Sequence, residues 1–289
     1  MTLKRYKQII FLISGLTLIV SVLTISIYWE ERGKSNVEVV FLDVGQGDSV
    51  LIKTKYNQQI LIDGGPDAAV LGRLGRHLPF YDRDLDMVIA THPDADHIAG
   101  LVDVLKRYSV GLVLQPGLTH STGINQALQD EIGKKSITER TVAGRQIYDL
   151  GDNLWLDVLY PDMSFAGQDL EDTNMASIVA KLTDGEIDYL FTGDAPVAVE
   201  DKLAANNRSL VRSEVLKIGH HGSKTSSSDV WLDAVAPAAA VIQVGKDNNY
   251  GHPSLTILNR LKKSQIPVLR TDELGDITLA SDGEFVELK

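Results

Sequence analysis

Residues 91–100, THPDADHIAG, contain an unusual density of side chains that can do chemistry. Four of them, His92, Asp94, Asp96 and His97, fall within six positions. Imidazoles and carboxylates are the groups that bind hard or borderline divalent cations. The chain has no cysteine, so any metal ligands must come from His, Asp and Glu. The stretch therefore predicts a metal centre.

A strand and a helix are expected to position these ligands. Residues 87–90, MVIA, form a short apolar run that predicts a buried strand, and residues 98–106 fit a helix. The four side chains are thus expected in a loop at the carboxyl end of a strand. In α/β sheets this is the usual place for functional groups.

Two later stretches repeat the pattern of an apolar strand followed by ligand-type residues. Asp194 follows residues 187–191, and His220 and His221 follow residues 215–218. Adjacent histidines point in different directions, so one cation is expected to bind only one of them. We assign His221 to the metal and His220 to the substrate side, although the residues leave the reverse order open.

Further polar residues lie downstream of these ligands. Ser223 and Lys224 begin a hydroxyl-rich run that either binds phosphate oxygens or simply precedes a helix at residues 229–235. His252 precedes another predicted helix. Asp63 ends a predicted strand and is interpreted either as a support for the ligands or as a turn residue. Two further histidines, His77 and His120, are not expected to be ligands.

These strings together resemble a known family. THPDADH is similar to the H-x-H-x-D-H signature of the metallo-β-lactamase superfamily, with Asp94 in place of the second histidine. With LDVGQGDSVLI at residues 42–52 and NYGHP at 249–253, the chain resembles the extracellular hydrolase domain of ComEC-type competence (DNA-uptake) proteins. It is also similar to secreted cell-wall phosphodiesterases of that superfamily. The implied fold is α/β, a four-layer αβ/βα sandwich over residues 37–289.

The resemblance also implies a metal site and roles for its residues. Two divalent cations, Zn or Mn, are expected, with Asp194 linking them. The implied metal ligands are His92, Asp94, Asp96, His97, Asp194 and His221; the catalytic residues are Asp96, His220 and His252; and the substrate-binding residues are Ser223, Lys224 and His252. Many superfamily members have another histidine before the bridging aspartate. Here that region reads EDTNMAS, so Asp172, Asn174 or water is expected to replace it.

The N-terminal region predicts a membrane anchor. Residues 8–29 are 22 consecutive uncharged, mostly apolar residues, preceded by basic residues 1–7 and followed by a polar linker at 30–36. A helix of that length rises about 33 Å, enough to span a bilayer core of about 30 Å. The basic flank places the remainder outside the cell. A cleaved signal peptide is the alternative, but no clear cleavage site is present.

The charge of the chain bears on its substrate. Residues 36–289 contain 23 basic and 37 acidic residues, a net charge of −14, so long-range attraction to nucleic acid is not expected. The expected function is a membrane-anchored, single-pass extracellular metal-dependent hydrolase. Its partners would be membrane lipid and either single-stranded DNA or a cell-wall phosphodiester polymer. The alternatives are hydrolysis of a lactone or amide, and a non-catalytic module that assists DNA uptake.

Overall fold

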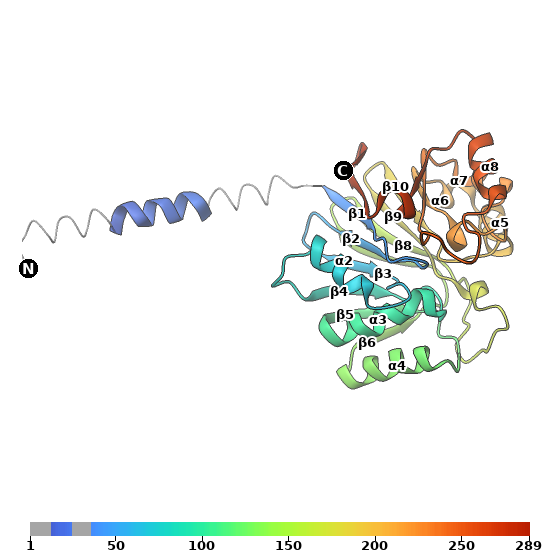
Figure 1. The fold of residues 1–289 in the computed structure, drawn as a ribbon, viewed down its shortest axis with the longest axis horizontal. Coiled ribbons are helices and arrows are strands. Elements are labelled where there is room, and N and C mark those ends of the chain that lie inside the picture. Colours follow the sequence, from blue (N-terminus) through green and yellow to red (C-terminus); the bar gives the residue numbers. More distant parts are fainter. Residues whose placement is uncertain (1–12, 25–35) are drawn as a thin grey trace, which may run out of the picture. The chain divides into compact units, whose positions relative to one another are not determined.

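The computed structural model describes residues 13–24 and 36–289. Residues 13–24 are helical, and Val37–Lys289 form a separate compact unit (Figure 1). Within these described ranges, no helix combines the length and apolar character required to cross a bilayer. The predicted span at residues 8–29 lies partly outside them and stays a prediction.

Two mixed β-sheets form the middle of the compact unit. The first has eight strands in the order β15-β14-β1-β2-β3-β4-β5-β6, and the second has seven in the order β13-β12-β11-β10-β9-β8-β7. The first sheet consists of β1 (Val37–Phe41), β2 (Val50–Lys53), β3 (Gln59–Ile62), β4 (Asp84–Ile89), β5 (Ser109–Gln115), β6 (Thr138–Thr141), β14 (Ile277–Ser281) and β15 (Val286–Leu288). The second consists of β7 (Gln146–Gly151), β8 (Leu154–Tyr160), β9 (Val179–Asp184), β10 (Ile187–Phe191), β11 (Val215–Lys217), β12 (Ala239–Ile242) and β13 (Val268–Arg270).

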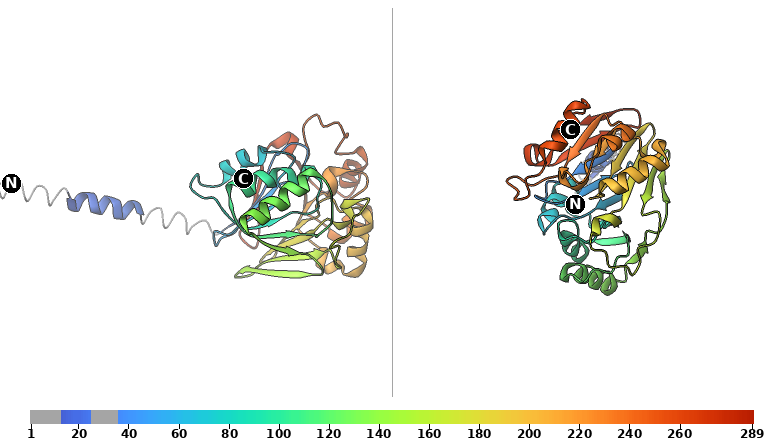
Figure 2. Two further views of the ribbon diagram at one scale, coloured as in Figure 1. Left: turned by 90° about the horizontal axis from the view of Figure 1, so that it is seen from below. Right: turned by 90° about the vertical axis from the view of Figure 1, so that its right-hand side faces the viewer.

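Helices cover the outer faces of both sheets (Figures 1 and 2). The first sheet packs against α2 (Ala69–His77), α3 (Ala95–Arg107) and α4 (Gly123–Lys135). The second packs against α5 (Val197–Asn206), α6 (Arg208–Val211), α7 (Asp229–Val235) and α8 (Leu255–Lys263). Short helical turns occur at η1 (Thr173–Ala176), η2 (Gly219–Gly222) and α9 (Thr271–Leu274).

Strand β1 shows why these residues form the layers. Val39 and Phe41 face the second sheet, whereas Val40 packs against the helices, and all three are fully buried. A strand covered on both faces is apolar at successive positions rather than at alternate ones. The cluster between the sheets and the two clusters beneath the helices therefore give the four layers that the sequence predicted.

Parallel pairing brings the predicted site together. In the first sheet β3 pairs with β4 in parallel, and in the second β10 pairs with β11 and β11 with β12 in parallel. The residues that follow these strands therefore lie at the same edge of their sheet.

One local prediction was wrong. The four ligand-type residues at 92–97 were expected in a loop, but α3 begins at Ala95, so Asp96 and His97 lie in its first turn. Asp94 occupies the extended N-cap position of this helix, which suits an aspartate.

Candidate metal centre

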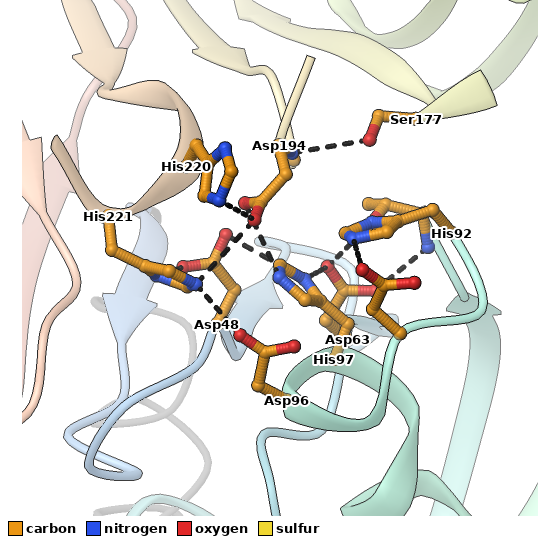
Figure 3. Close-up of polar contacts among 12 residues, drawn as sticks. Asp48, Asp63, His92, Asp96, His97, Ser177, Asp194, His220 and His221 are labelled. Carbon is orange, nitrogen blue, oxygen red and sulfur yellow. Dashed lines mark hydrogen bonds and ion pairs between the residues drawn. The ribbon is translucent and has the colours of Figure 1, made fainter. Parts of the chain in front are cut away.

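Four side chains from both halves of the fold meet in one cluster (Figure 3). Ligand atoms of Asp96, His97, Asp194 and His221 all lie within 4.8 Å of one another. His97 Nε2 is 3.3 Å from Asp194 Oδ1, and His221 Nε2 is 3.2 Å from Asp96 Oδ2. We call these four residues the central cluster. All four were predicted to bind metal.

Hydrogen bonds fix the orientation of both histidines in the central cluster. His97 Nδ1 is 2.8 Å from Asp63 Oδ2, and His221 Nδ1 is 3.0 Å from the carbonyl oxygen of Gln243. Asp63 is held in turn by the backbone N–H and the hydroxyl of Thr91, at 2.8 and 2.7 Å. With Nδ1 donating a proton, each ring directs Nε2 into the cluster, as metal-binding histidines do.

The electrostatics of the central cluster fit a cation. Burial opposes the charged form of His97, but Asp194 and Asp63 raise its pKa well above the usual value. Burial likewise disfavours ionised Asp194, yet His97 and His221 hold its pKa well below the usual range. His97 Nε2 and Asp194 Oδ1 are buried without hydrogen-bond partners. Such atoms are rare in folded proteins, and a cation would satisfy both.

A buried ion pair lies behind the central cluster. Lys217 and Asp48 are 2% exposed and contact each other directly. Asp48 also lies 3.2 Å from His221 Nδ1, and Lys217 donates to the carbonyl oxygen of Gly193 at 3.0 Å. Lys217 thus stabilises the loop that carries Asp194. Since the amine already neutralises Asp48, the nearby group of Asp48, Asp63 and His97 is better understood as support than as another metal site.

Gly47 lets the Asp48 loop approach α3. A Cβ atom at this position would collide with the backbone carbonyl of Asp96, and its φ of +153° favours glycine. The same contact allows the Asp48 N–H to donate to the Asp96 carbonyl at 3.3 Å. This explains the second glycine of the LDVGQGDS string.

His92 and Asp94 form an arm beside the central cluster. His92 Nε2 is buried without a hydrogen-bond partner and lies 3.7 Å from Asp94 Oδ2. Its ring centroid is 4.1 Å from that of His97. Burial and the neighbouring His97 lower the pKa of His92 to about 4, which keeps the imidazole neutral. The arm is therefore suited to binding a cation, although it does not form a complete ligand set.

The segment expected to replace the missing histidine contributes hydroxyl groups. Thr173 Oγ1 donates to Asp94 Oδ1 at 2.5 Å, and Ser177 Oγ accepts from the Asp194 N–H at 3.3 Å. The Asp172 carboxylate instead caps its own turn by accepting the Asn174 N–H. The Asn174 Oδ1 atom is buried without a partner. Thr173 and Ser177 thus position the arm and the central cluster.

His220 and His252 lie on the more exposed side of the central cluster. His220 Nε2 is 3.7 Å from Asp194 Oδ2, its side chain is 28% exposed, and its ring centroid is 6.0 Å from that of His252. His220 and His221 both adopt left-handed backbone angles, with φ of 50° and 51°. Such strain at non-glycine residues is typical of functional loops.

The other predicted substrate residues differ in their surroundings. Ser223 is buried, and its Oγ accepts hydrogen bonds from Thr225, whose hydroxyl lies 3.2 Å from His220 Nδ1. Lys224 is exposed. His77 pairs with Asp276 and is not part of the central cluster, in line with the expectation that it is not a ligand.

Sequence reasoning missed several residues that support this centre. Asp48, Lys217, Gln243, Thr173 and Ser177 were given no role. Lys217 had a detectable signal, because a single lysine within the apolar run VLKI predicts either an edge position or a buried ion pair. Gln243 had none, since its contribution is a backbone carbonyl.

Comparison with known proteins identifies relatives. ComE operon protein 3 of Bacillus subtilis is 30% identical over 84% of this chain and 33% of its own length. Competence protein ComA of Neisseria gonorrhoeae is 31% identical over 84% of this chain and 32% of its own. Recombination protein 2 of Haemophilus influenzae is 31% identical over 86% of this chain and 29% of its own length. The chain spans about a third of the length of these curated relatives.

Solved structures share the fold. CmlA, a diiron β-hydroxylase from Streptomyces venezuelae, gives a TM-score of 0.56 at 16% identity, over 86% of this chain and 54% of CmlA. Igni18, a metallo hydrolase from Ignicoccus hospitalis, gives a TM-score of 0.52 at 12% identity, over 84% of this chain and 98% of Igni18. Identities this low show the fold alone.

A family model described as the metallo-beta-lactamase superfamily matches residues 42–246, which include the whole central cluster. The resemblance noted in the sequence is confirmed, and the relatives support its link to competence proteins. This chain therefore belongs to the metallo-β-lactamase superfamily, whose fold is that of metal-dependent hydrolases.

Proposed function

We propose that the protein is a metal-dependent phosphodiesterase that cleaves single-stranded DNA. The observation that carries the proposal is the central cluster, in which two carboxylates lie beside two imidazoles, three of the four residues are buried, and polar atoms lack hydrogen-bond partners. Such a ligand set suits Zn²⁺ or Mn²⁺, which also bind phosphate oxygens. The similarity to a protein named for competence supports DNA as the substrate.

The residues fall into groups by position. The central cluster would hold one cation, and His92 and Asp94 would share a second with Asp194. When bound, such cations lower the pKa of a coordinated water and offset charge on a phosphate. Asp63 and Gln243 keep the two histidine rings in the required orientation.

His220 and His252 would serve the substrate. Both are partly exposed beside Asp194, so a phosphate bound at the cluster would lie within their reach. Burial and the neighbouring His220 lower the pKa of His252, which favours a neutral ring that donates a hydrogen bond to phosphate. His220 is then the better placed of the two to protonate the departing oxygen.

The test uses the full chain in detergent with Mn²⁺ or Zn²⁺. Single-stranded DNA, bis(p-nitrophenyl) phosphate and a β-lactam are offered separately. We expect hydrolysis of both phosphodiesters and its loss in Asp96→Asn. The matched control is Asp103→Asn on the same helix, because the Asp96 and Asp103 side chains are 38% and 37% exposed. The control should retain activity.

Three outcomes would contradict the proposal. Cleavage of the β-lactam alone would point to hydrolysis of a lactone or amide. Binding of DNA without cleavage would point to an accessory module for DNA uptake. Cleavage of bis(p-nitrophenyl) phosphate but not of DNA would point to another phosphodiester substrate, such as a cell-wall polymer.

The membrane location is part of the same proposal. The uncharged residues 8–29 with their basic flank support a single-pass anchor and an extracellular catalytic unit. Protease added to intact cells should remove the catalytic unit from the membrane fraction. Complete protection, with digestion only after lysis, would contradict this orientation.

A further inference from the structure

We propose that Tyr250 is a stacking platform for a nucleobase beside the scissile phosphate. This inference rests on the proposed DNA phosphodiesterase function and adds a binding subsite to it. Tyr250 is 72% exposed, and its ring lies nearly parallel to that of His252, at 16° with centroids 6.0 Å apart. His252 in turn lies 6.0 Å from His220. A row of rings thus leads from the central cluster to the surface.

The loop that presents Tyr250 is held in place by one side chain. Asn248 Oδ1 accepts from the backbone N–H groups of Tyr250 and His252, both at 3.1 Å. Asn248 Nδ2 donates to the carbonyl oxygens of Gly245 and His252 at 3.0 and 2.7 Å. An aromatic ring exposed on a fixed loop has already lost most of the entropy that binding would cost. Its exposure is therefore suited to a ligand.

The surroundings of this loop favour a nucleic acid strand. Lys246 on the same loop and Lys224 on the loop after η2 are both exposed. The two loops are joined by a hydrogen bond of 2.9 Å from the Ser254 N–H to the Gly222 carbonyl. These two lysines, one on each of the joined loops of a strongly acidic protein, provide local attraction for phosphates.

A base is the group that this platform fits. Every base has a flat face, so stacking on tyrosine does not require a particular sequence and contributes about 1–3 kcal/mol per base. A phosphodiester polymer of sugar alcohols has no such face. The subsite therefore separates single-stranded DNA from base-free polymers that the central cluster alone would accept.

The test compares oligothymidylate with an oligomer of the same length whose bases are replaced by abasic tetrahydrofuran units. Kd is measured by anisotropy in chelator, and kcat and KM are measured with Mn²⁺. Tyr250→Ala should raise Kd and KM for oligothymidylate about tenfold, which corresponds to about 1.4 kcal/mol. Its values for the abasic oligomer should equal those of the unchanged protein. Tyr250→Phe should restore DNA binding.

Tyr81→Ala is the matched control, because Tyr81 is 71% exposed in the loop before β4, at the opposite end of that strand from the ligands. It should bind both oligomers normally. The inference is overturned if Tyr250→Ala weakens the binding of both oligomers equally, or of neither. It is also overturned if Tyr250→Ala instead weakens a polyol phosphate polymer. Failure of the proposed function is distinguishable, because the unchanged protein would then bind DNA but cleave neither DNA nor bis(p-nitrophenyl) phosphate.

Discussion

Asp63 is the residue on which the geometry of His97 depends. Its carboxylate accepts the Nδ1 proton of His97 and is held by Thr91 from the other side. Asp63→Asn should keep the fold but weaken Mn²⁺ binding about 10–100-fold, because an amide can stabilise the wrong tautomer of the ring. Titration against a chromophoric chelator measures this affinity.

A second His–Asp pair provides the control for this prediction. His77 and Asp276 are 3.0 Å apart, and neither belongs to the central cluster. Asp276→Asn should leave Mn²⁺ affinity unchanged. Equal affinities of Asp63→Asn and the unchanged protein would show that Asp63 is merely a turn residue, the alternative that its sequence context left open.

Lys217 illustrates how a buried charge supports a metal site. Removing it in Lys217→Met leaves the buried Asp48 carboxylate without its lysine partner, which should lower the free energy of unfolding by about 3–5 kcal/mol. Urea denaturation in chelator measures this loss. The double variant Asp48→Asn/Lys217→Met should recover part of it.

The pair of Lys181 and Asp188 is the comparison. Lys181 Nζ lies 2.9 Å from Asp188 Oδ2, but the two side chains are 11% and 22% exposed and so are less buried than Lys217 and Asp48. Lys181→Met should cost about 1 kcal/mol or less. If both lysine variants lose the same stability, the Lys217 pair has no special role in the interior.

At the scale of elements, the histidine loop is fixed by α5. Glu200 is fully buried on that helix and accepts the N–H groups of Ser227 and Ser228, at 2.9 and 3.4 Å. Arg260 from α8 donates to the carbonyl oxygens of the same serine run. The run at residues 223–228, expected from sequence either to bind phosphate oxygens or simply to precede a helix, is therefore held in place by α5 and α8 next to His220 and His221.

Glu200 predicts a pH dependence of stability. Burial raises its pKa to about 8 against 4.5 unfolded, although the two serine N–H groups oppose the shift. The folded state then retains a proton that the unfolded state releases, so the free energy of unfolding falls as pH rises from about 4.5 through about 8. The loss should be on the order of a few kcal/mol.

Glu200→Gln tests this dependence, because the glutamine side chain does not titrate and its single oxygen can still accept one of the two serine N–H groups. Other groups of the protein also change protonation on unfolding, so the difference in unfolding free energy between the two proteins is compared in urea denaturation at pH 5 and pH 8.5. The difference should shift in favour of Glu200→Gln at the higher pH. Parallel profiles would mean that Glu200 is ionised throughout.

The sequence predicted most elements because local pattern specifies them. The helix at Asp229–Val235 and the strand at Ile187–Phe191 match their predicted bounds. The start of α3 was misplaced because ligand-type residues were taken to indicate a loop. Asp94 has the extended backbone of an N-cap residue, although its side chain makes no capping hydrogen bond, and Asp96 in the first turn favours the helix through its dipole. The functional interpretation hid an ordinary capping signal.

At the scale of the whole molecule, contacts between distant residues were beyond local pattern. Strand β1 pairs with β14, and Val37 lies opposite Ser281. Lys217 likewise contacts Asp48, a residue far from it in sequence. Nothing near either residue in sequence specifies these pairings, because register depends on long-range packing. The ligand cluster was predictable only because its family resemblance supplied what spacing does not.

The central cluster links the two sheets, and this makes the whole fold sensitive to metal. Asp96 and His97 come from the helix that packs on the first sheet, whereas Asp194 and His221 follow strands of the second. A cation bound here cross-links the two halves and binds the folded state only. At a free concentration 100 times its Kd, it should add about 2.7 kcal/mol to the free energy of unfolding. For a domain of this size the melting temperature should rise by roughly 5–10 °C.

Calorimetry of the full chain, with chelator and then with excess Mn²⁺ or Zn²⁺, measures the rise. Asp194→Asn should abolish most of it, and Asp103→Asn should not. Identical melting temperatures with and without either cation would mean that these side chains form a network of ion pairs and not a metal centre.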